Sequence, residues 1–249
     1  MHTKTKLVSG VMLLGLIAAL AGPQAVMSAK QAAAEQLDPA LCSPTQNTFT
    51  TTINNPYFPL PVGQQWVYQG KEQGETLGLR ITVLNQTETF RFGGTRVTTR
   101  VVEEVEWFDA NANGVIDPGE ELIERSLNYF AQTTAGTVCY FGEIVDIYEN
   151  GVVVSHEGSW RADQRGNAPG IFMPANPQPG MTFAQENAPG VAEDQATILR
   201  FATARTPAGT FSNALRVRDL NPLDGSSGIK LYAPGVGLVI DGPLELISF

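Results

Sequence analysis

Apolar and polar residues alternate along much of the chain beyond residue 56, and this period of two is the pattern of β-strands with one covered face. One run holds Leu77, Leu79, Ile81 and Val83 at every second position. In the next run the apolar positions are Val97, Val101, Val105 and Trp107, and the alternate positions include Thr98, Arg100, Glu104 and Glu106. The two runs predict strands whose apolar side chains face a core.

Tight-turn sequences separate such runs. Gly93-Gly94 follows one strand pattern, and Asn150-Gly151, a strong hairpin signal, follows another. The proline-rich segment 166–180 predicts a long ordered loop without regular sheet. No helical pattern exceeds about two turns. Many short strands linked by tight turns indicate an all-β fold, and we expect a curved antiparallel sheet. A barrel, a half-barrel, a sandwich and a lipocalin-like calyx all remain open as its form.

The first residues form the pattern of a cleaved signal peptide. Lys4 and Lys6 precede an apolar run over 7–21, and small residues follow near Ala29. We therefore expect a signal peptide over 1–29, a polar tether over 30–55, and a single β domain over 56–249. The expected location is secreted or periplasmic, without membrane insertion, because no second apolar run is long enough to span a bilayer. Cys42 lacks the preceding small residue of a lipobox, so no lipid anchor is expected.

Charge narrows the range of partners. The whole chain has a formal net charge of −9, and removing the two lysines of residues 1–29 leaves −11. Such a surface repels nucleic acid and anionic membranes and suits cations.

The two cysteines, Cys42 and Cys139, both lie in the segment expected to be exported. An oxidising compartment favours a disulfide between them, and two buried free thiols are the alternative. A disulfide would tie the N-terminal segment to a central strand.

The twelve residues 109–120 match the loop of an EF-hand, and the resemblance covers this segment only. Calcium requires six to eight oxygen ligands, which such a loop supplies from fixed positions. The expected ligands are Asp109, Asn111, Asn113, the Val115 carbonyl, Asp117 and Glu120. Gly114 allows the sharp bend. The flanking residues alternate like strands, so we expect the loop at the tip of a hairpin, with a structural role and a Kd of about 10⁻⁴ to 10⁻³ M.

Two phrases of the sequence resemble a family of uncharacterised secreted or lipid-anchored bacterial β-proteins. The first is Asn-Pro-Tyr-Phe-Pro-Leu-Pro-Val-Gly-Gln-Gln-Trp-Val-Tyr over 55–68. The second combines Thr-Pro-Ala-Gly-Thr-Phe over 206–211 with Tyr-Ala-Pro-Gly-Val-Gly-Leu-Val over 232–239. The resemblance implies a curved antiparallel sheet, with a calyx as an analogy, and implies no activity.

The sequence therefore favours a secreted, calcium-binding β domain in which calcium is structural. A carrier of a small apolar ligand is the first alternative, with Leu79, Ile81, Val101 and Trp107 as cavity residues. The second alternative is a hydrolase that uses His156 with nearby acids such as Glu157, Glu186, Glu193 and Asp194. No nucleophile elbow supports an enzyme, so none is expected. No protein partner can be named from the residues.

Overall fold

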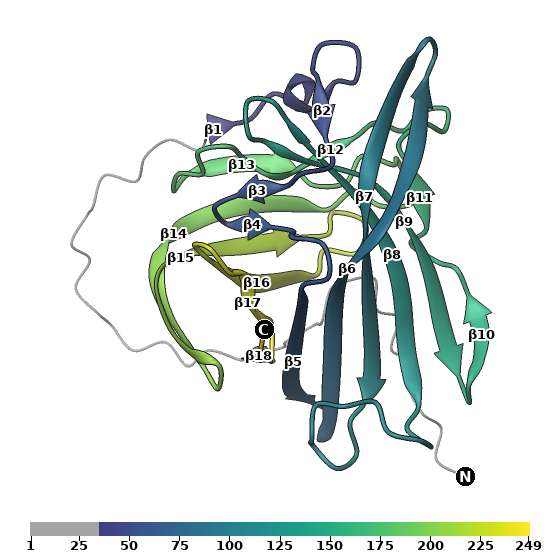
Figure 1. The fold of residues 1–249 in the computed structure, drawn as a ribbon, viewed down its shortest axis with the longest axis vertical. Helices are drawn as coiled ribbons and strands as arrows, with labels where there is room; N and C mark the ends of the chain where they lie inside the picture. Colours follow the sequence, from purple (N-terminus) through teal and green to yellow (C-terminus); the bar gives the residue numbers. More distant parts are fainter. Residues whose placement is uncertain (1–34) are drawn as a thin grey trace.

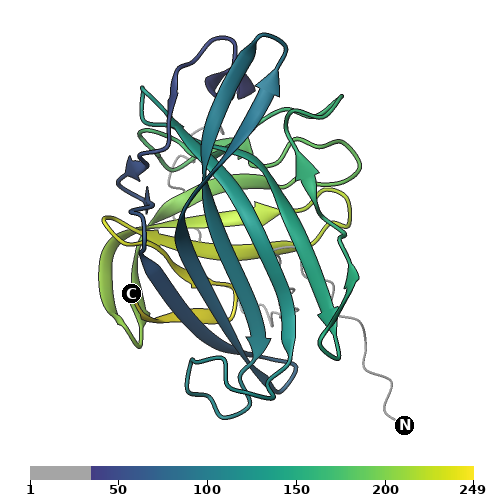
Figure 2. The ribbon, with the colours of Figure 1, turned by 45° about the vertical axis from the view of Figure 1, so that its right-hand side comes forward.

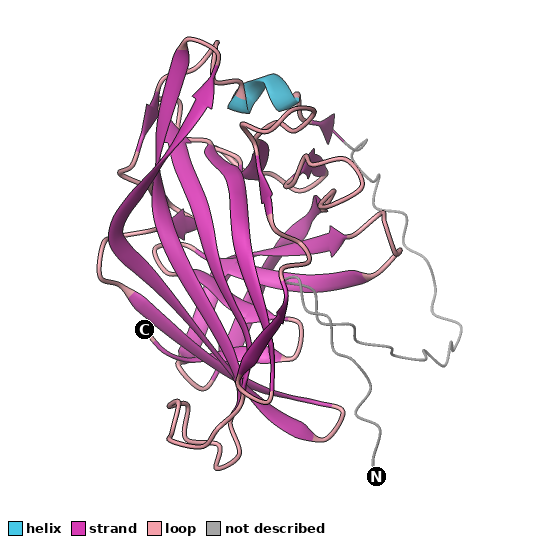
Figure 3. Cartoon of the chain, turned by 90° about the vertical axis from the view of Figure 1, so that its right-hand side faces the viewer, coloured by secondary structure: helices cyan, strands magenta, loops and turns pink. Residues whose placement is uncertain are grey.

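The computed structural model describes residues 35–249 of the chain; the predicted signal peptide lies outside the described residues. Strands dominate this part, and the helical element is one 3₁₀ turn, η1 (Pro39–Cys42) (Figure 3). The strands of the first half are β1 (Glu35–Gln36), β2 (Phe49–Thr50), β3 (Asn54–Asn55), β4 (Phe58–Pro59), β5 (Gln65–Glu72), β6 (Glu75–Phe92), β7 (Thr95–Phe108), β8 (Leu122–Thr133) and β9 (Val138–Glu149). The second half contains β10 (Val152–Ser155), β11 (Trp160–Arg161), β12 (Gly170–Met173), β13 (Met181–Ala184), β14 (Gln195–Thr206), β15 (Gly209–Leu220), β16 (Ser227–Ala233), β17 (Gly237–Asp241) and β18 (Leu244–Ser248). None of the helices in this range is long and apolar enough to cross a membrane.

Sixteen of these strands form one open sheet. Its main path runs β1-β13-β14-β15-β16-β17-β18-β5-β6-β7-β8-β9-β10, and the pairings are antiparallel except that of β1 with β13. The curved antiparallel sheet expected from the sequence is confirmed. A closed barrel and a two-sheet sandwich are not, because the path begins at β1 and ends at β10 without joining.

The sheet folds into two groups of strands whose directions cross. In Figure 1 the long strands β5 to β9 run along the molecule and β13 to β17 run across it. Figure 2 shows the same crossing after a turn of 45°. Pairing of β18 with β5 connects the two groups, with Glu245 opposite Gln69 and Leu246 opposite Tyr68. A concave face therefore lies between them.

Local turn chemistry explains most connections. Gly93 and Gly94 link β6 to β7, and Asn150 and Gly151 link β9 to β10, both as expected. Asn150 and Gly151 have φ values of 53° and 75°, which is the backbone of a type I′ hairpin turn. The expected loop over 166–180 is wrong in part, because residues 170–173 form β12 and pair with β9. Prolines flank this short strand and leave its own N–H groups available for pairing.

The side chains of β7 face the two sides of the sheet differently from what the sequence predicts. Glu104 lies opposite Ile81 and Glu106 lies opposite Leu79, so these carboxyl groups share the face of the apolar residues of β6. Trp107 lies opposite Gly78, on the other face, and is fully buried there. A Cβ at Gly78 would run into the Trp107 ring, which therefore lies directly over this glycine. Both faces of the sheet are covered at this point, and the alternation alone could not say which face is the interior.

The N-terminal segment is attached to the sheet. β1 pairs with β13, β2 pairs with β8, and Cys42 forms the expected disulfide with Cys139 of β9. Both cysteines are fully buried, and their Cα atoms are 5.7 Å apart. The disulfide therefore fixes the end of η1 to β9, the last strand of the β5–β9 group.

Candidate functional site

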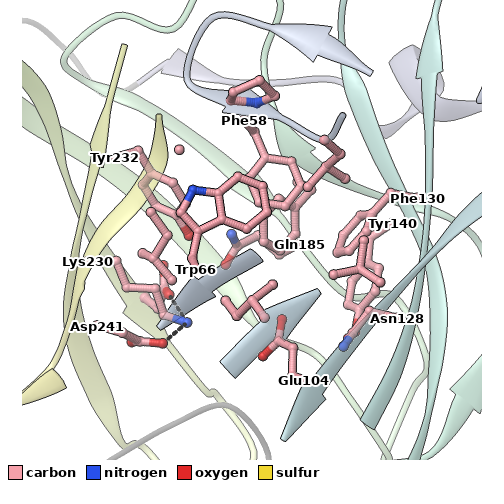
Figure 4. A pocket seen from close by; sticks show the side chains of 18 of the residues that line it. Phe58, Trp66, Glu104, Asn128, Phe130, Tyr140, Gln185, Lys230, Tyr232 and Asp241 are labelled. Atoms are coloured by element: carbon pink, nitrogen blue, oxygen red, sulfur yellow. Dashed lines mark hydrogen bonds and ion pairs between the residues drawn. The ribbon is translucent and has the colours of Figure 1, made fainter. Parts of the chain in front are cut away.

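A cavity lies on the concave face, between the two groups of strands. Its volume of about 70 Å³ is room for a few water molecules or a compact ligand group. Figure 4 shows how the side chains converge on it from both groups. The polar residues that line it are Glu104, Asn128, Gln185, Glu186, Asp194, Asp219, Lys230 and Asp241. The lining aromatic residues are Phe58, Trp66, Tyr68, Phe130, Tyr140, Phe172 and Tyr232.

Aromatic side chains make one wall of this cavity rigid. Phe58 packs edge-on against Phe130 with ring centroids 5.2 Å apart, and Phe130 stacks on Tyr140 at 4.7 Å. Trp66 Nε1 donates a hydrogen bond to the Val236 carbonyl at 2.9 Å, which fixes its ring. Since the Nε1 edge of Trp66 is already engaged, the face of its indole ring is the surface left for a ligand.

The opposite wall carries a buried ion-pair cluster around Lys230 of β16. Its Nζ lies 3.2 Å from Asp241 Oδ2 and 3.6 Å from Asp219 Oδ2 (Figure 4). Burial disfavours the ammonium, but the two carboxylates outweigh that effect and hold the pKa of Lys230 well above its usual value. Burial raises the pKa of Asp219 to about 6, although Lys230 acts to lower it. The ammonium is thus permanently charged and already shared by two acids.

Glu104 of β7 projects into the cavity without a direct partner. It makes no hydrogen bond or ion pair with any residue of the described range, and Lys230 acts on it only at longer range. Its side chain is half-buried, because part of its surface borders the cavity. Burial raises its pKa to about 7, with Lys230 lowering the value and Asp241 raising it. Near neutral pH this carboxyl group is available either as an anion or as a proton donor.

Further acids continue along the same face beside the cavity. Glu106 lies directly opposite Glu124 on β8, and both are buried. Burial raises the pKa of Glu106 to about 8 and that of Glu124 well above its usual value. Burial likewise raises the pKa of Glu143 to about 8, and burial together with the charge of Glu143 raises the pKa of Glu186 well above its usual value. Burial therefore favours the protonated form of these four acids.

The sequence analysis missed this cluster. Nothing in the local pattern marks Glu104 as inward, because Val105 and Trp107, at the alternate positions, are the apolar residues of the run. Lys230 stands in an ordinary strand pattern, and its two acidic partners come from β15 and β17. Of the four residues expected to line a cavity, Ile81 does so, whereas Trp107 is packed on the other face.

The predicted calcium loop connects β7 to β8, at the tip of a hairpin as expected. Asp109 is fully buried at its start. Its Oδ1 accepts the Asn113 N–H at 3.1 Å, and its Oδ2 accepts the Gly114 N–H and the Gln69 side-chain amide, both at 2.8 Å. The positive φ of 74° at Gly114 provides the sharp bend that the loop requires. The loop is thereby fixed against β5.

The remaining predicted ligands lie close to one another. Asp117 Oδ2 accepts hydrogen bonds from the side-chain amides of Asn111 and Asn113, each at 2.7 Å. Glu120 Oε1 accepts the Ala110 N–H at 2.9 Å, and Oε2 accepts the Asp117 N–H at 3.0 Å. The Val115 side chain is exposed, which suits a residue that would contribute only its carbonyl. The side chains at the first, third, fifth, ninth and twelfth positions are therefore linked in one network, and calcium binding by it stays a prediction.

His156 lies apart from the cavity lining. Its Nδ1 is 2.9 Å from the Val145 carbonyl and 2.9 Å from Asp146 Oδ1, and two thirds of its side chain is exposed. The hydrolase alternative joined His156 with Glu186 and Asp194, but these two acids line the cavity instead. These contacts are those of a surface histidine at the end of β10.

No known family model matches the chain, and no curated protein matches it. One solved structure that it resembles is described as an exported protein with a YmcC-like fold from Bacteroides fragilis NCTC 9343. The match has 16% identity and a TM-score of 0.39, and it covers 77% of this chain and 97% of that one. A second is described as a lipoprotein from Parabacteroides distasonis ATCC 8503. It has 15% identity and a TM-score of 0.32, and covers 74% of this chain and 88% of that one. Neither description includes a ligand or an activity.

Proposed function

We propose that the protein is an exported β-protein whose loop 109–120 binds one calcium ion as a structural staple. The network that links Asp109, Asn111, Asn113, Asp117 and Glu120 supports this most directly, because it brings together the oxygen-bearing side chains of the first, third, fifth, ninth and twelfth positions of a calcium-type loop. The export rests on the sequence pattern of residues 1–29.

The position of the loop supports a structural role for the proposed ion. Asp109 binds Gln69 of β5, and a Cβ at Gly114 would meet Ile247 and Val67 on the outer face of β18 and β5. The loop therefore lies over the junction between the two groups of strands. Calcium bound there would strengthen a contact between β7, β5 and β18 and would not reorient helices as in an EF-hand sensor.

Thermal unfolding with and without calcium tests the proposal. A ligand that binds only the folded state at 100 times its Kd adds about 2.7 kcal/mol of stability, roughly 5 to 10 °C in Tm for a domain of this size. We expect that difference between millimolar calcium and chelator in the wild-type protein. Magnesium should substitute poorly, because it prefers six short bonds and keeps its waters.

Variants of the loop and of a matched turn localise the effect. Glu120→Gln keeps an acceptor for the backbone N–H groups but weakens the closing ligand, so the calcium-dependent shift should mostly disappear. Asp224→Ala, in the β15–β16 turn where Asp224 accepts the Ser226 N–H at 2.7 Å, should keep the shift. Identical melting in calcium and chelator, together with no heat of binding by calorimetry, would show that the loop is an ordinary turn.

A second candidate function is a carrier of a small ligand, which the cavity on the concave face specifically favours. Binding sites for small molecules combine apolar and aromatic walls with a few placed polar groups, and this cavity has both. The apolar ligand considered from the sequence fits one wall only, because the other wall carries carboxyl groups.

A further inference from the structure

We infer that the concave cavity binds a small organic cation, with its ammonium group paired with Glu104 and its apolar substituents against Trp66 and the neighbouring aromatic rings. The inference rests on the carrier function and specifies its ligand.

The charge of the lining is the first reason. Five carboxyl groups border the cavity and Lys230 is their one cationic neighbour among the lining residues. That ammonium is already held between Asp219 and Asp241. An anionic ligand would have to displace one of those carboxylates, whereas a cation would meet free acceptors.

Two carboxyl groups, those of Glu104 and Asp219, offer such acceptors. Glu104 has no direct partner in the described range. Asp219 is buried, with 4% of its surface exposed, and its Oδ1 has no hydrogen-bond partner in the described structure. Leaving a buried acceptor without a protein partner is unfavourable, so a hydroxyl donor on the ligand, such as that of choline, would gain a partner at Asp219 Oδ1.

The register places Glu104 and Trp66 at a suitable separation. Trp66 pairs with Ile81, and Ile81 pairs with Glu104, so the three side chains form one row on the concave face across β5, β6 and β7. Strands are about 4.8 Å apart, so the two outer residues of the row start about 10 Å apart. A tetrahedral ammonium lying over Ile81 could then contact the carboxylate on one side and the indole face within about 6 Å on the other. Figure 4 shows Glu104, Trp66 and Lys230 around the same space.

The aromatic residues determine the kind of cation. Phe58 and Tyr232 lie next to one another, with ring centroids 6.4 Å apart, and both line the cavity with Trp66. Aromatic faces attract ammonium groups that carry alkyl substituents, because such groups are weakly hydrated and contact the rings directly. The cavity of about 70 Å³ limits the ligand to a compact headgroup. A methylated or short-chain alkyl ammonium meets both conditions.

Three probes of matched shape test the inference: choline, its uncharged carbon analogue 3,3-dimethylbutan-1-ol, and the anion 3,3-dimethylbutanoate. Each is titrated into the mature protein at pH 8 in millimolar calcium, with binding measured by calorimetry and by saturation-transfer NMR. We expect choline to bind at least tenfold more tightly than the alcohol and the anion not to bind.

Glu104→Gln and Glu103→Gln separate the site from the rest of the strand. Glu103 is the neighbour of Glu104 on the opposite face of β7, where it pairs with Arg125. Glu104→Gln should weaken choline binding at least tenfold and leave the affinity for the alcohol unchanged, and Glu103→Gln should leave both unchanged. Circular dichroism and melting curves confirm that each variant is folded.

The possible results distinguish an error in the ligand class from an error in the carrier function. If the alcohol binds as tightly as choline, the cavity is a carrier site but the cation inference is overturned. Preferential binding of the anion would overturn it in favour of Lys230 as the anchor. If none of the three probes binds at 10 mM to a folded protein, both the ligand class and the carrier function are overturned, while the calcium proposal is unaffected.

Discussion

The fold should lose stability as the pH rises from 5 to 9, because burial favours the protonated form of the acids on the concave face. Glu106 should contribute most clearly to this loss of stability, because burial raises its pKa from the ordinary value of 4.5 to about 8 in the folded protein. Between those values the folded protein holds a proton that the unfolded chain releases. Stability therefore falls as the pH rises through this window and levels off above about pH 8.

The size of the effect follows from the same values. A pKa raised from 4.5 to about 8 corresponds to roughly 5 kcal/mol between the two protonation states. The groups that face Glu106 are Glu124 on β8, Asp241 on β17, Glu72 on β5 and Glu104 on its own strand. All of them are acids, so ionisation of one opposes ionisation of the others. Water that enters beside the ionised group would reduce the loss, so we expect about 2 to 4 kcal/mol.

Urea unfolding at pH 5, 7 and 9, followed by tryptophan fluorescence in constant calcium, measures this loss. Glu106→Gln replaces the titrating group with a neutral one of similar shape, so it should stabilise the protein by about 2 to 4 kcal/mol at pH 9 and by far less at pH 5. Glu245→Gln, at an exposed position of β18, is the matched control and should follow the wild type at every pH. If Glu106→Gln also runs parallel to the wild type, or the wild type is as stable at pH 9 as at pH 5, the account of the buried acids is wrong.

Two further predictions concern the covalent and steric framework. Replacing Cys42 and Cys139 by alanine opens a covalent loop with a sequence separation of 97 and should lower the free energy of unfolding by about 4 to 5 kcal/mol, as measured by urea unfolding. An unchanged free energy of unfolding would mean that the N-terminal segment detaches before the domain unfolds. Gly78→Ala should cost about 1 to 3 kcal/mol because the new methyl group meets the Trp107 ring, whereas Gly94→Ala, with open space around it, should be close to neutral in the same assay.

Local chemistry made part of this fold predictable. Asn150-Gly151 dictates a hairpin because both residues accept positive φ, and in the Gly93-Gly94 turn Gly93 takes a positive φ of 61°. A calcium loop could also be proposed from sequence, since the residues expected as ligands lie within twelve consecutive positions. The disulfide needed only the count and the expected compartment of the cysteines.

The concave site could not be predicted in this way, because it depends on which distant strands meet. The sequence places Glu104 between Glu103 and Val105, and only the pairing of β7 with β6 and β8 shows that its face is the interior. Lys230 is explained by Asp219 and Asp241, which reach it through two further strand pairings. Whether the sheet is open or closed into a barrel likewise depends on whether its two edge strands, β1 and β10, pair with each other.

The pairing of β18 with β5 has a consequence for the order of folding. Glu245 and Gln69 are neighbours in the sheet but are separated by more than 170 residues of chain. Contacts between such distant residues form slowly, because a long segment must be ordered before they contribute. While the chain emerges from a ribosome or a translocation channel, β5 to β9 can pair among themselves, but β5 keeps an open edge until residues 244–248 arrive. The concave face, and with it any ligand site, is completed only in this last step.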